Sequence, residues 1–305
     1  ELWNQAEPLI REIFERIERT PQEEKLFTII PQEAKNYQRY KNLLFLSTLD
    51  ATDDLSKMIN SNLSEAALSK VNEGEFIFTK TEVWAQDQKV MFLVAPDIAT
   101  LLELMQANKD NIFFQFENHW QEFHKNILYS TKDNYNIEKH LLQNYGWMLE
   151  VPADYRLEIQ SARDRFVLFH RKVPLRWIAV FWEEASDPNI ISKDYCISKR
   201  NEFADSFYEG EVVADKFEPV TTTEVNFQNR RALYLRGLWE NNKKVGGGPF
   251  RMYCFFDEQT ERIYFIDMHM FAPDLKKSKM HYLRQMDIIA QTFKTNLEIS
   301  VDELP

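Results

Sequence analysis

The chain has 305 residues, of which 44% are hydrophobic and 28% are charged, and its formal net charge is −11. The length fits about two domains, and the composition is that of a folded globular protein, which excludes a largely disordered chain. An acidic surface repels a phosphate backbone, so we expect no nucleic-acid partner. The densest basic run, 275–284, is interpreted as a solvated helix face or, alternatively, as an anion or lipid-headgroup site.

The first half of the sequence alternates helical patterns with short apolar runs. Apolar residues recur at helical spacing in several segments, which begin at proline or at residues that cap helices. The expected helices are 8–19, 54–71, 97–107, 111–129 and 137–144. The expected strands, which are short apolar runs between polar segments, are 26–30, 43–48, 75–84 and 89–94. Gly146 is expected to end the last helix in a left-handed conformation, and we place a domain boundary there.

Beyond this boundary the apolar period changes to two, which is typical of strands. The expected strands are 155–160, 165–171, 176–182, 224–239 and a hairpin over 250–271, and the expected helices are 192–208 and 275–297. Sheets built in this order are largely antiparallel, with helices packed on one face. The sequence therefore predicts an α+β protein of two domains, 1–145 and 146–305.

The chain contains two cysteines, Cys196 and Cys254. Two thiols cannot form a structural zinc site by themselves, because such sites take four ligands. Since Cys196 falls in an expected helix and Cys254 in an expected strand, we expect both to be small buried apolar groups. A single disulfide between them is the alternative.

Four of the seven glycines of this chain lie within twelve positions, and three of them, Gly246, Gly247 and Gly248, precede Pro249. The missing side chains allow either a tight connection into a sheet or the close backbone approach of a ligand. This segment lacks the lysine and threonine of a phosphate-binding loop and the spacing of a dinucleotide fingerprint. We therefore expect neither kind of nucleotide site, and no cofactor.

The hairpin that follows carries the polar residues nearest to these glycines. If it turns through two residues at 258–259, Phe250 faces Asp267, and period two places Asp267 and His269 on one face. An imidazole beside a carboxylate can bind a metal or transfer protons, but it is also a common hydrogen bond in sheets, and the sequence indicates no third metal ligand. We find no nucleophile elbow and no paired acid and base, which favours binding or structure over catalysis.

Several segments carry a family resemblance. They are RGLW at 236–239, GGPF at 247–250, FAPDLKKSKMHYLRQMDIIAQTF at 271–293, PQEEKLFTIIP at 21–31, KNLLFL at 41–46 and GWMLEVPADYRL at 146–157. In this order they resemble the family catalogued as domain of unknown function 4837, over nearly the whole chain. The sequence departs from the family's more proline-rich pattern at 20–25.

Members of this family are mostly predicted lipoproteins of Bacteroidetes-type bacteria. The resemblance therefore implies a lipid-modified cysteine upstream of Glu1 and a cell-envelope location, with the membrane reached only through that anchor. It implies no activity and no catalytic residue. The second half also looks like the PsbP/Mog1 arrangement, an antiparallel sheet between helices that mostly serves assembly or binding.

Three functional hypotheses result. In the first, a non-enzymatic envelope lipoprotein binds an unknown protein or small-molecule ligand near Trp239 and the glycines. In the second, a metal-dependent or hydrolytic enzyme uses Asp267 and His269 together with the loop Gly246–Gly248. In the third, the protein is an intracellular scaffold. The candidate binding residues are Arg236, Trp239, Gly246, Gly247, Gly248, Asp267 and His269.

Overall fold

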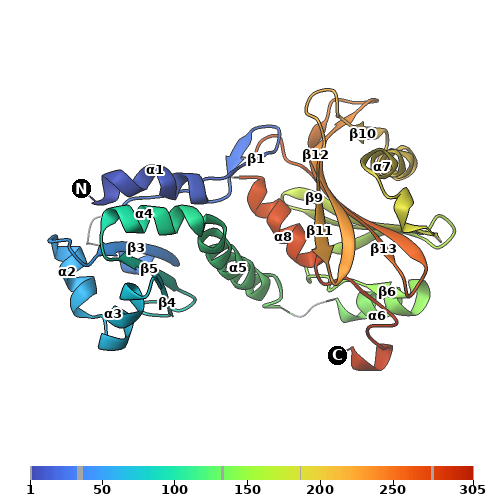
Figure 1. The fold of residues 1–305 in the computed structure, drawn as a ribbon. Coiled ribbons are helices and arrows are strands. Elements are labelled where there is room, and N and C mark those ends of the chain that lie inside the picture. The colour runs from blue at the N-terminus through green and yellow to red at the C-terminus, as the bar shows by residue number, and fades with distance from the viewer. Residues whose placement is uncertain (1, 33–36, 132–133, 186, 276–277, 305) are drawn as a thin grey trace. The chain divides into compact units, whose positions relative to one another are not determined.

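The computed structural model describes residues 2–32, 37–131, 134–185, 187–275 and 278–304 (Figure 1). The chain divides into two compact units, of which the first is Glu1–Ile17 with Lys25–Phe123 and the second is Glu18–Glu24 with His124–Pro305. This division precedes helix α6 (Tyr135–Tyr145), whereas the sequence predicts a boundary after it. The helix belongs with the second unit because its buried Glu138 accepts a hydrogen bond from the backbone N–H of Val151 at 2.9 Å.

The first unit is a three-stranded sheet with helices on both faces. Strand β3 runs parallel to β5, and β4 runs antiparallel to β5. The sheet and helix bounds are α1 Leu2–Phe14, β3 Asn42–Thr48, α2 Asp54–Ser61, α3 Glu65–Asn72, β4 Ile77–Thr81, β5 Lys89–Ala95, α4 Ile98–Ala107 and, continuing into the second unit, α5 Lys109–Leu128. Leu46 and Leu93 face α1 and α4, whereas Phe45 and Val94 face α2 and α3. Burial on both faces explains why these strands are continuous apolar runs.

Three expected elements of this region differ in the structure. The helix expected over 8–19 is α1, which ends at Phe14 and is followed by a hairpin of β1 (Ile17–Arg19) and β2 (Glu23–Lys25). The segment expected to be a strand over 26–30 is not one. The strand of this region is β2, which lies just before it in the sequence and pairs with β1. The helix expected over 54–71 is two helices, since the side chain of Ser64 caps a new helix start.

The second unit is built on one curved antiparallel sheet of eight strands (Figure 1). The strand order is β10-β12-β13-β14-β9-β8-β7, and β11 pairs with β12 beside β10. The bounds are β7 Arg156–Ser161, β8 Phe166–Lys172, β9 Leu175–Glu184, α7 Lys193–Phe207, β10 Glu211–Val213, β11 Thr221–Phe227, β12 Arg230–Asn241, β13 Gly247–Asp257, β14 Arg262–Phe271 and α8 Met280–Ala290. The α+β class is confirmed.

Helices cover both faces of this sheet, not one face as the sequence predicts. Cys196 of α7 packs on the face that carries Met252, while Asp287 of α8 bonds to the side chain of Arg251 on the opposite face. Helix α8 is shorter than the expected 275–297, and Lys276 and Lys277 of the basic run lie outside the described residues. No helix in the described part of the chain is long and apolar enough to cross a membrane.

The turn between β13 and β14 is longer than the sequence predicts. Phe250 pairs with His269 rather than with Asp267, and Asp257 pairs with Arg262 across four turn residues. The side chain of Asp257 holds this turn by accepting bonds from the backbone and hydroxyl of Thr260. Because the register differs by two residues, every side chain stays on the expected face.

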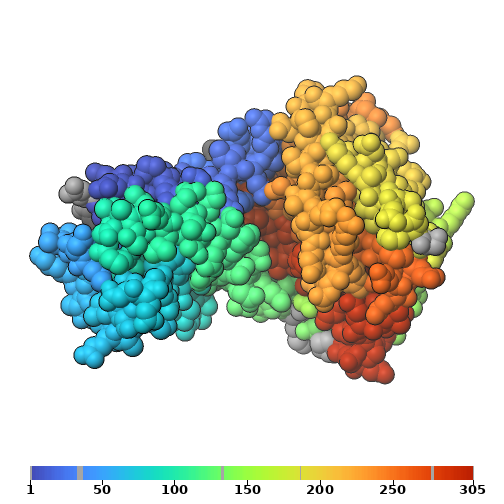
Figure 2. All heavy atoms as spheres, in the orientation of Figure 1, coloured from blue at the N-terminus to red at the C-terminus, as the bar shows by residue number. Residues whose placement is uncertain are grey.

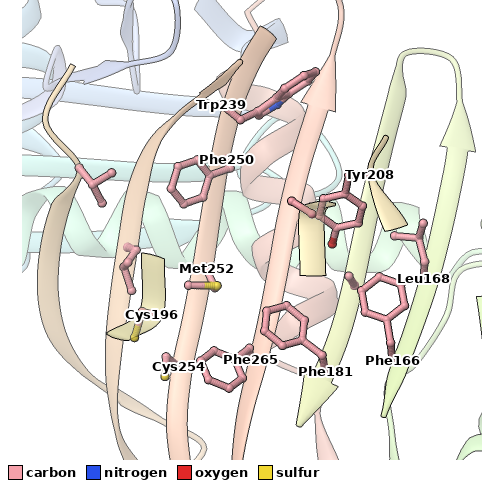
Figure 3. Packing of buried hydrophobic residues seen from close by; sticks show 14 of the residues in the cluster. Phe166, Leu168, Phe181, Cys196, Tyr208, Trp239, Phe250, Met252, Cys254 and Phe265 are labelled. Atoms are coloured by element: carbon pink, nitrogen blue, oxygen red, sulfur yellow. The ribbon is translucent and has the colours of Figure 1, made fainter. Parts of the chain in front are cut away.

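The core beneath α7 is aromatic and contains both cysteines (Figure 3). The rings of Phe181 and Phe265 stack with centroids 4.7 Å apart. Cys196 and Cys254 are both buried and free, which confirms the expected apolar role rather than the disulfide. Burial and the neighbouring Cys196 thiol raise the pKa of Cys254 well above its usual range.

A carboxylate from the segment 18–24 caps helix α8. Glu24 accepts hydrogen bonds from the backbone N–H groups of Lys279 and Met280, both at 3.0 Å, and from the hydroxyl of Ser278. No side chain at the start of α8 itself makes this cap. Glu24 therefore satisfies donors that the helix leaves unpaired, although more than 250 residues separate it from them.

Replacing Glu24 by alanine is expected to lower the stability of the second unit by about 2 kcal/mol near pH 7. Burial raises the pKa of Glu24, but the bonds from Ser278, Met280 and Lys279 outweigh it and lower the pKa. A carboxyl with a lowered folded pKa stabilises above its ordinary pKa, and this contribution disappears as pH falls through the folded pKa. Chemical denaturation near pH 7 and at about pH 3 should therefore show that the difference in stability between Glu24→Ala and the unmodified protein becomes smaller in acid. The exposed neighbour Glu23 is the control, and an equal loss in Glu23→Ala would contradict the cap.

Candidate functional site

The expected site residues lie on both faces of the sheet, because Arg236 and Trp239 of β12 point to opposite sides. Trp239 packs in the core beneath α7, and Asp267 and His269 of β14 lie on the same face. Arg236 points to the opposite face, where its Nη1 donates to Oε1 of Glu18 at 3.0 Å. The structure therefore brings Trp239, Asp267 and His269 together and separates Arg236 from them.

Asp267 and His269 form a buried ionic cluster with helix α7. Nδ1 of His269 lies 3.0 Å from Oδ2 of Asp267, and Nε of Arg200 donates to Oδ1 of Asp267 at 2.8 Å. The three side chains are at most 1% exposed. Glu211 of β10 completes the cluster, with Oε2 at 3.7 Å from Nε2 of His269.

The charges of this cluster are set by burial and by the arginine. Burial raises the pKa of Asp267, but the guanidinium of Arg200 and the bond to His269 outweigh it, and the net pKa is lowered. Burial raises the pKa of Glu211, and the guanidinium of Arg200, 3.9 Å away, is too distant to compensate fully. Asp267 is thus an internal counter-ion of Arg200, which is a structural task.

Aromatic rings enclose the imidazole of His269. The Trp177 ring stacks on it with centroids 4.9 Å apart, the Tyr208 ring lies 4.6 Å away, and Trp239 approaches by its edge at 6.1 Å. Trp239 is only 4% exposed. Among the described residues no three His, Cys, Asp or Glu side chains are grouped so that they could hold a metal ion.

The glycines at the start of β13 allow backbone and indole to approach one another. A Cβ on Gly248 would lie 2.1 Å from the carbonyl oxygen of Met270 and 3.1 Å from Nε1 of Trp239. A Cβ on Gly247 would lie 2.9 Å from the carbonyl oxygen of Trp239, whereas Gly246 has no neighbour within 3.7 Å of that position. Close packing inside the sheet therefore accounts for Gly247 and Gly248.

A second ionic cluster, built around the buried Arg251, lies on the opposite face and was not predicted from the sequence. Arg251 of β13 pairs with Glu18 and with Asp287 of α8, and the hydroxyl of Tyr234 donates to Asp287 at 2.9 Å. Burial raises the pKa of Asp287, whereas Arg251 and Arg236 hold the pKa of Glu18 below its usual value despite burial. An arginine inside the apolar run of β13 is the one local signal of this cluster.

An open groove of about 640 Å³ lies elsewhere on the second unit. Its apolar residues include Leu233 of β12 and Phe256 of β13. Further lining comes from Ile191, which follows the short helix η2 (Pro188–Ile190), and from Glu224 of β11. This groove is not predicted from the sequence, because its position depends on which strand forms the edge of the sheet.

Residues 134–292 match the model of a family described as domain of unknown function (DUF4837). The chain belongs to this family. The resemblance seen in the sequence is thus confirmed for residues 134–292, but it does not extend over nearly the whole chain as expected, because the segments at 21–31 and 41–46 lie outside this match. The DUF4837 match covers the eight-stranded sheet, the cluster around Asp267 and most of the groove. Residues 1–129 match a second domain of unknown function (DUF8532). No curated protein matches the sequence.

Solved structures similar to this DUF4837 member are distant. The Ran-binding protein Mog1p of Saccharomyces cerevisiae has 10% identity and a TM-score of 0.34 over 49% of this chain and 90% of its own. LpqN, involved in cell envelope biogenesis of Mycobacterium tuberculosis, has 15% identity and a TM-score of 0.29 over 48% and 82%. A Bacteroides thetaiotaomicron protein has 8% identity and a TM-score of 0.29 over 50% of this chain and 46% of its own, less than half its length. The expected likeness to Mog1 is therefore found, at a distance that indicates no function.

Proposed function

We propose that this protein is a binding module of the cell envelope and that it binds its partner at the groove beside β11. The envelope location is supported by the family resemblance, because members of the family are mostly predicted lipoproteins. The binding role is supported by one observation above all, the open groove of about 640 Å³, whereas the Asp267 and His269 cluster predicted from the sequence is buried.

The composition of the groove fits a binding site. An apolar surface at Leu233 and Phe256 lies among polar and charged side chains such as Glu224 and Arg231. Sites that hold ligands commonly combine apolar lining with a few polar groups that fix orientation. Exposed polar residues at the hairpin turns, among them Asn229 and Gln259, also line the groove and can reach a partner.

A catalytic role for Asp267 and His269 has less support. The carboxylate is already bonded to Arg200, and the imidazole is covered by three aromatic rings. A general base must come within hydrogen-bond reach of the proton that it removes. Such reach would require the displacement of α7 or of its neighbours from the sheet.

In-cell photo-crosslinking tests the proposed function. A benzophenone amino acid at Gln259, in the groove, is expected to give a discrete adduct in the envelope fraction. The same amino acid at Arg163, an exposed turn residue on the same unit but outside the groove lining, is the control and should give none. Adducts of equal yield from both positions, or a chain found in the cytoplasmic fraction, would argue against the proposal.

A further inference from the structure

We infer that the free edge of β11 accepts an extended, basic segment of a partner protein as an additional strand. This inference rests on the proposed function, since it names the class of partner that the same groove receives. Three observations support it: the unpaired backbone groups of β11, the continuous register of this edge strand, which has no proline and no lysine, and the charge of the adjoining groove.

The register of the β11–β12 hairpin identifies the backbone groups that are free. Gln228 and Asn229 form its two-residue turn and both have positive φ, 48° and 62°, as such turns require. The flanking pair Phe227 and Arg230 is therefore hydrogen-bonded, and bonded pairs recur at every second residue. The outward-pointing N–H and C=O groups consequently belong to Thr222, Glu224 and Asn226.

Among the described strands, β11 pairs only with β12, so its outer edge has no partner strand there. Residues 221–224 are all exposed. The space-filling view shows the orange atoms of this region at the surface (Figure 2). A row of unpaired backbone donors and acceptors is a template for strand addition.

The two edges of the sheet differ in how they are protected. Strand β7, at the opposite edge, has a register shift between Leu157 and Ile159 and carries the charged residues Arg156 and Glu158. Bulges and charges of this kind prevent unwanted pairing. Strand β11 pairs in continuous register, begins with three threonines, contains neither proline nor lysine, and has Glu224 as its one charged residue. Its edge therefore has the features of a strand that is meant to pair.

The charge of the groove favours a basic partner. Its acidic residues outnumber its arginines by four to two, which gives the lining a net charge of −2, although the arginines pair with three of these same acids, Glu224, Asp257 and Glu298. The acidic residues are Glu224, Asp257, Glu258 and Glu298, and the arginines are Arg230 and Arg231. A second copy of the chain would bring the same acidic edge and a net charge of −11, so self-pairing is disfavoured.

The face of β11 that adjoins the groove places this charge within reach of an added strand. Glu224 pairs across the hairpin with Leu233, so the two side chains share one face of the sheet. A neighbouring strand lies about 4.8 Å away, and its side chains alternate between the two faces. Every second side chain of the added strand therefore lies on the face of Glu224, and a lysine or arginine opposite this residue could share the carboxylate that already pairs with Arg231.

Peptide selection on the purified full chain tests the inference. A phage-displayed library of random dodecapeptides is expected to yield extended, basic sequences, whose affinity is then measured by fluorescence anisotropy. Thr222→Pro removes an outward N–H without touching the bonds to β12, and it should weaken binding about tenfold or more. Thr222→Val keeps that N–H and should change binding less than about twofold.

Two further measurements keep the test decisive if the proline variant folds poorly. Glu224→Lys should weaken basic peptides, and bound peptide should slow amide exchange at Thr222 and Glu224 in the unmodified chain. The inference is overturned if selected peptides are acidic, if they bind Thr222→Pro as tightly as Thr222→Val, or if sedimentation shows dimers that peptide does not dissociate. If crosslinking at Gln259 succeeds but peptides do not pair with β11, the groove remains the binding site. Only the addition of a strand at β11 is then wrong.

Discussion

Replacing Gly248 by alanine is expected to destabilise the second unit by about 3 kcal/mol or more. The new Cβ would lie 2.1 Å from the carbonyl oxygen of Met270, a distance that requires β13 and β14 to separate locally. Both strands lie in the middle of the sheet, so their separation disturbs the pairing on either side. The indole of Trp239, 3.1 Å away, leaves no space for the backbone to move in that direction.

Gly246→Ala is the matched control, because its Cβ would find only ordinary contacts at 3.7 Å and beyond. We expect a change below about 0.5 kcal/mol for this variant, as for most surface substitutions. Urea denaturation followed by tryptophan fluorescence compares the two proteins. Similar midpoints for the Gly246 and Gly248 variants would show that the glycines are not required by close packing, and a ligand role for the triplet would regain support.

Replacing Asp267 by asparagine is expected to cost about 3–5 kcal/mol, the usual penalty for breaking a buried ion pair. The change leaves the buried guanidinium of Arg200 beside a neutral amide, with the carboxyl group of Glu211 3.9 Å away. It also replaces one of the two acceptor oxygens that face Arg200 and His269 by an NH2 donor. Because the pKa of Asp267 is lowered in the folded state, its contribution is complete above the ordinary carboxyl pKa. That contribution is lost as pH falls through the folded pKa. The stability of Asp267→Asn should therefore be closest to that of the unmodified protein in acid.

The exposed pair of Glu224 and Arg231 provides the contrast, since its side chains are 65% and 79% exposed. Glu224→Gln should change stability by less than about 0.5 kcal/mol. Thermal or chemical denaturation of both variants near neutral pH measures the difference. If Asp267→Asn is as stable as Glu224→Gln, the cluster beneath α7 does not hold the fold, and a functional role for Asp267 becomes the better explanation.

Features that depend on local sequence could be predicted. The helical spacing around α5 and α7 placed both helices within two residues at each end. Gly146 has the expected left-handed conformation, with φ of 79°, because a residue without Cβ adopts it most easily. Period two placed Asp267 and His269 on one face, because residues two apart on one strand point to the same side whatever the pairing register.

Features that depend on contacts between residues far apart in the sequence could not be predicted. The length of the β13–β14 turn follows from bonds between Asp257 and Thr260, which no turn motif indicates. Glu24 caps a helix that begins more than 250 residues later, and a single sequence carries no signal of that pairing. The burial of Trp239 likewise depends on β12 lying beside β13, so an aromatic residue near glycines was interpreted as a binding surface.

The candidate binding surface was missed for a related reason. Residues 224–239 were expected to be strand, but the structure has a hairpin with its turn at Gln228 and Asn229. Without that turn, β11 does not exist as a separate strand, and the sheet has no free edge at this position. Positive φ at two consecutive non-glycine residues is uncommon, which explains why the turn was overlooked.

Amide hydrogen exchange along β11 in the protein alone shows whether this edge is open to a partner. We expect alternation, in which the amides of Thr222, Glu224 and Asn226 exchange at least about a hundredfold faster than those of Thr223 and Val225. Uniformly slow exchange at all five positions would mean that another part of the chain already pairs with this edge, and the proposed binding surface would not exist.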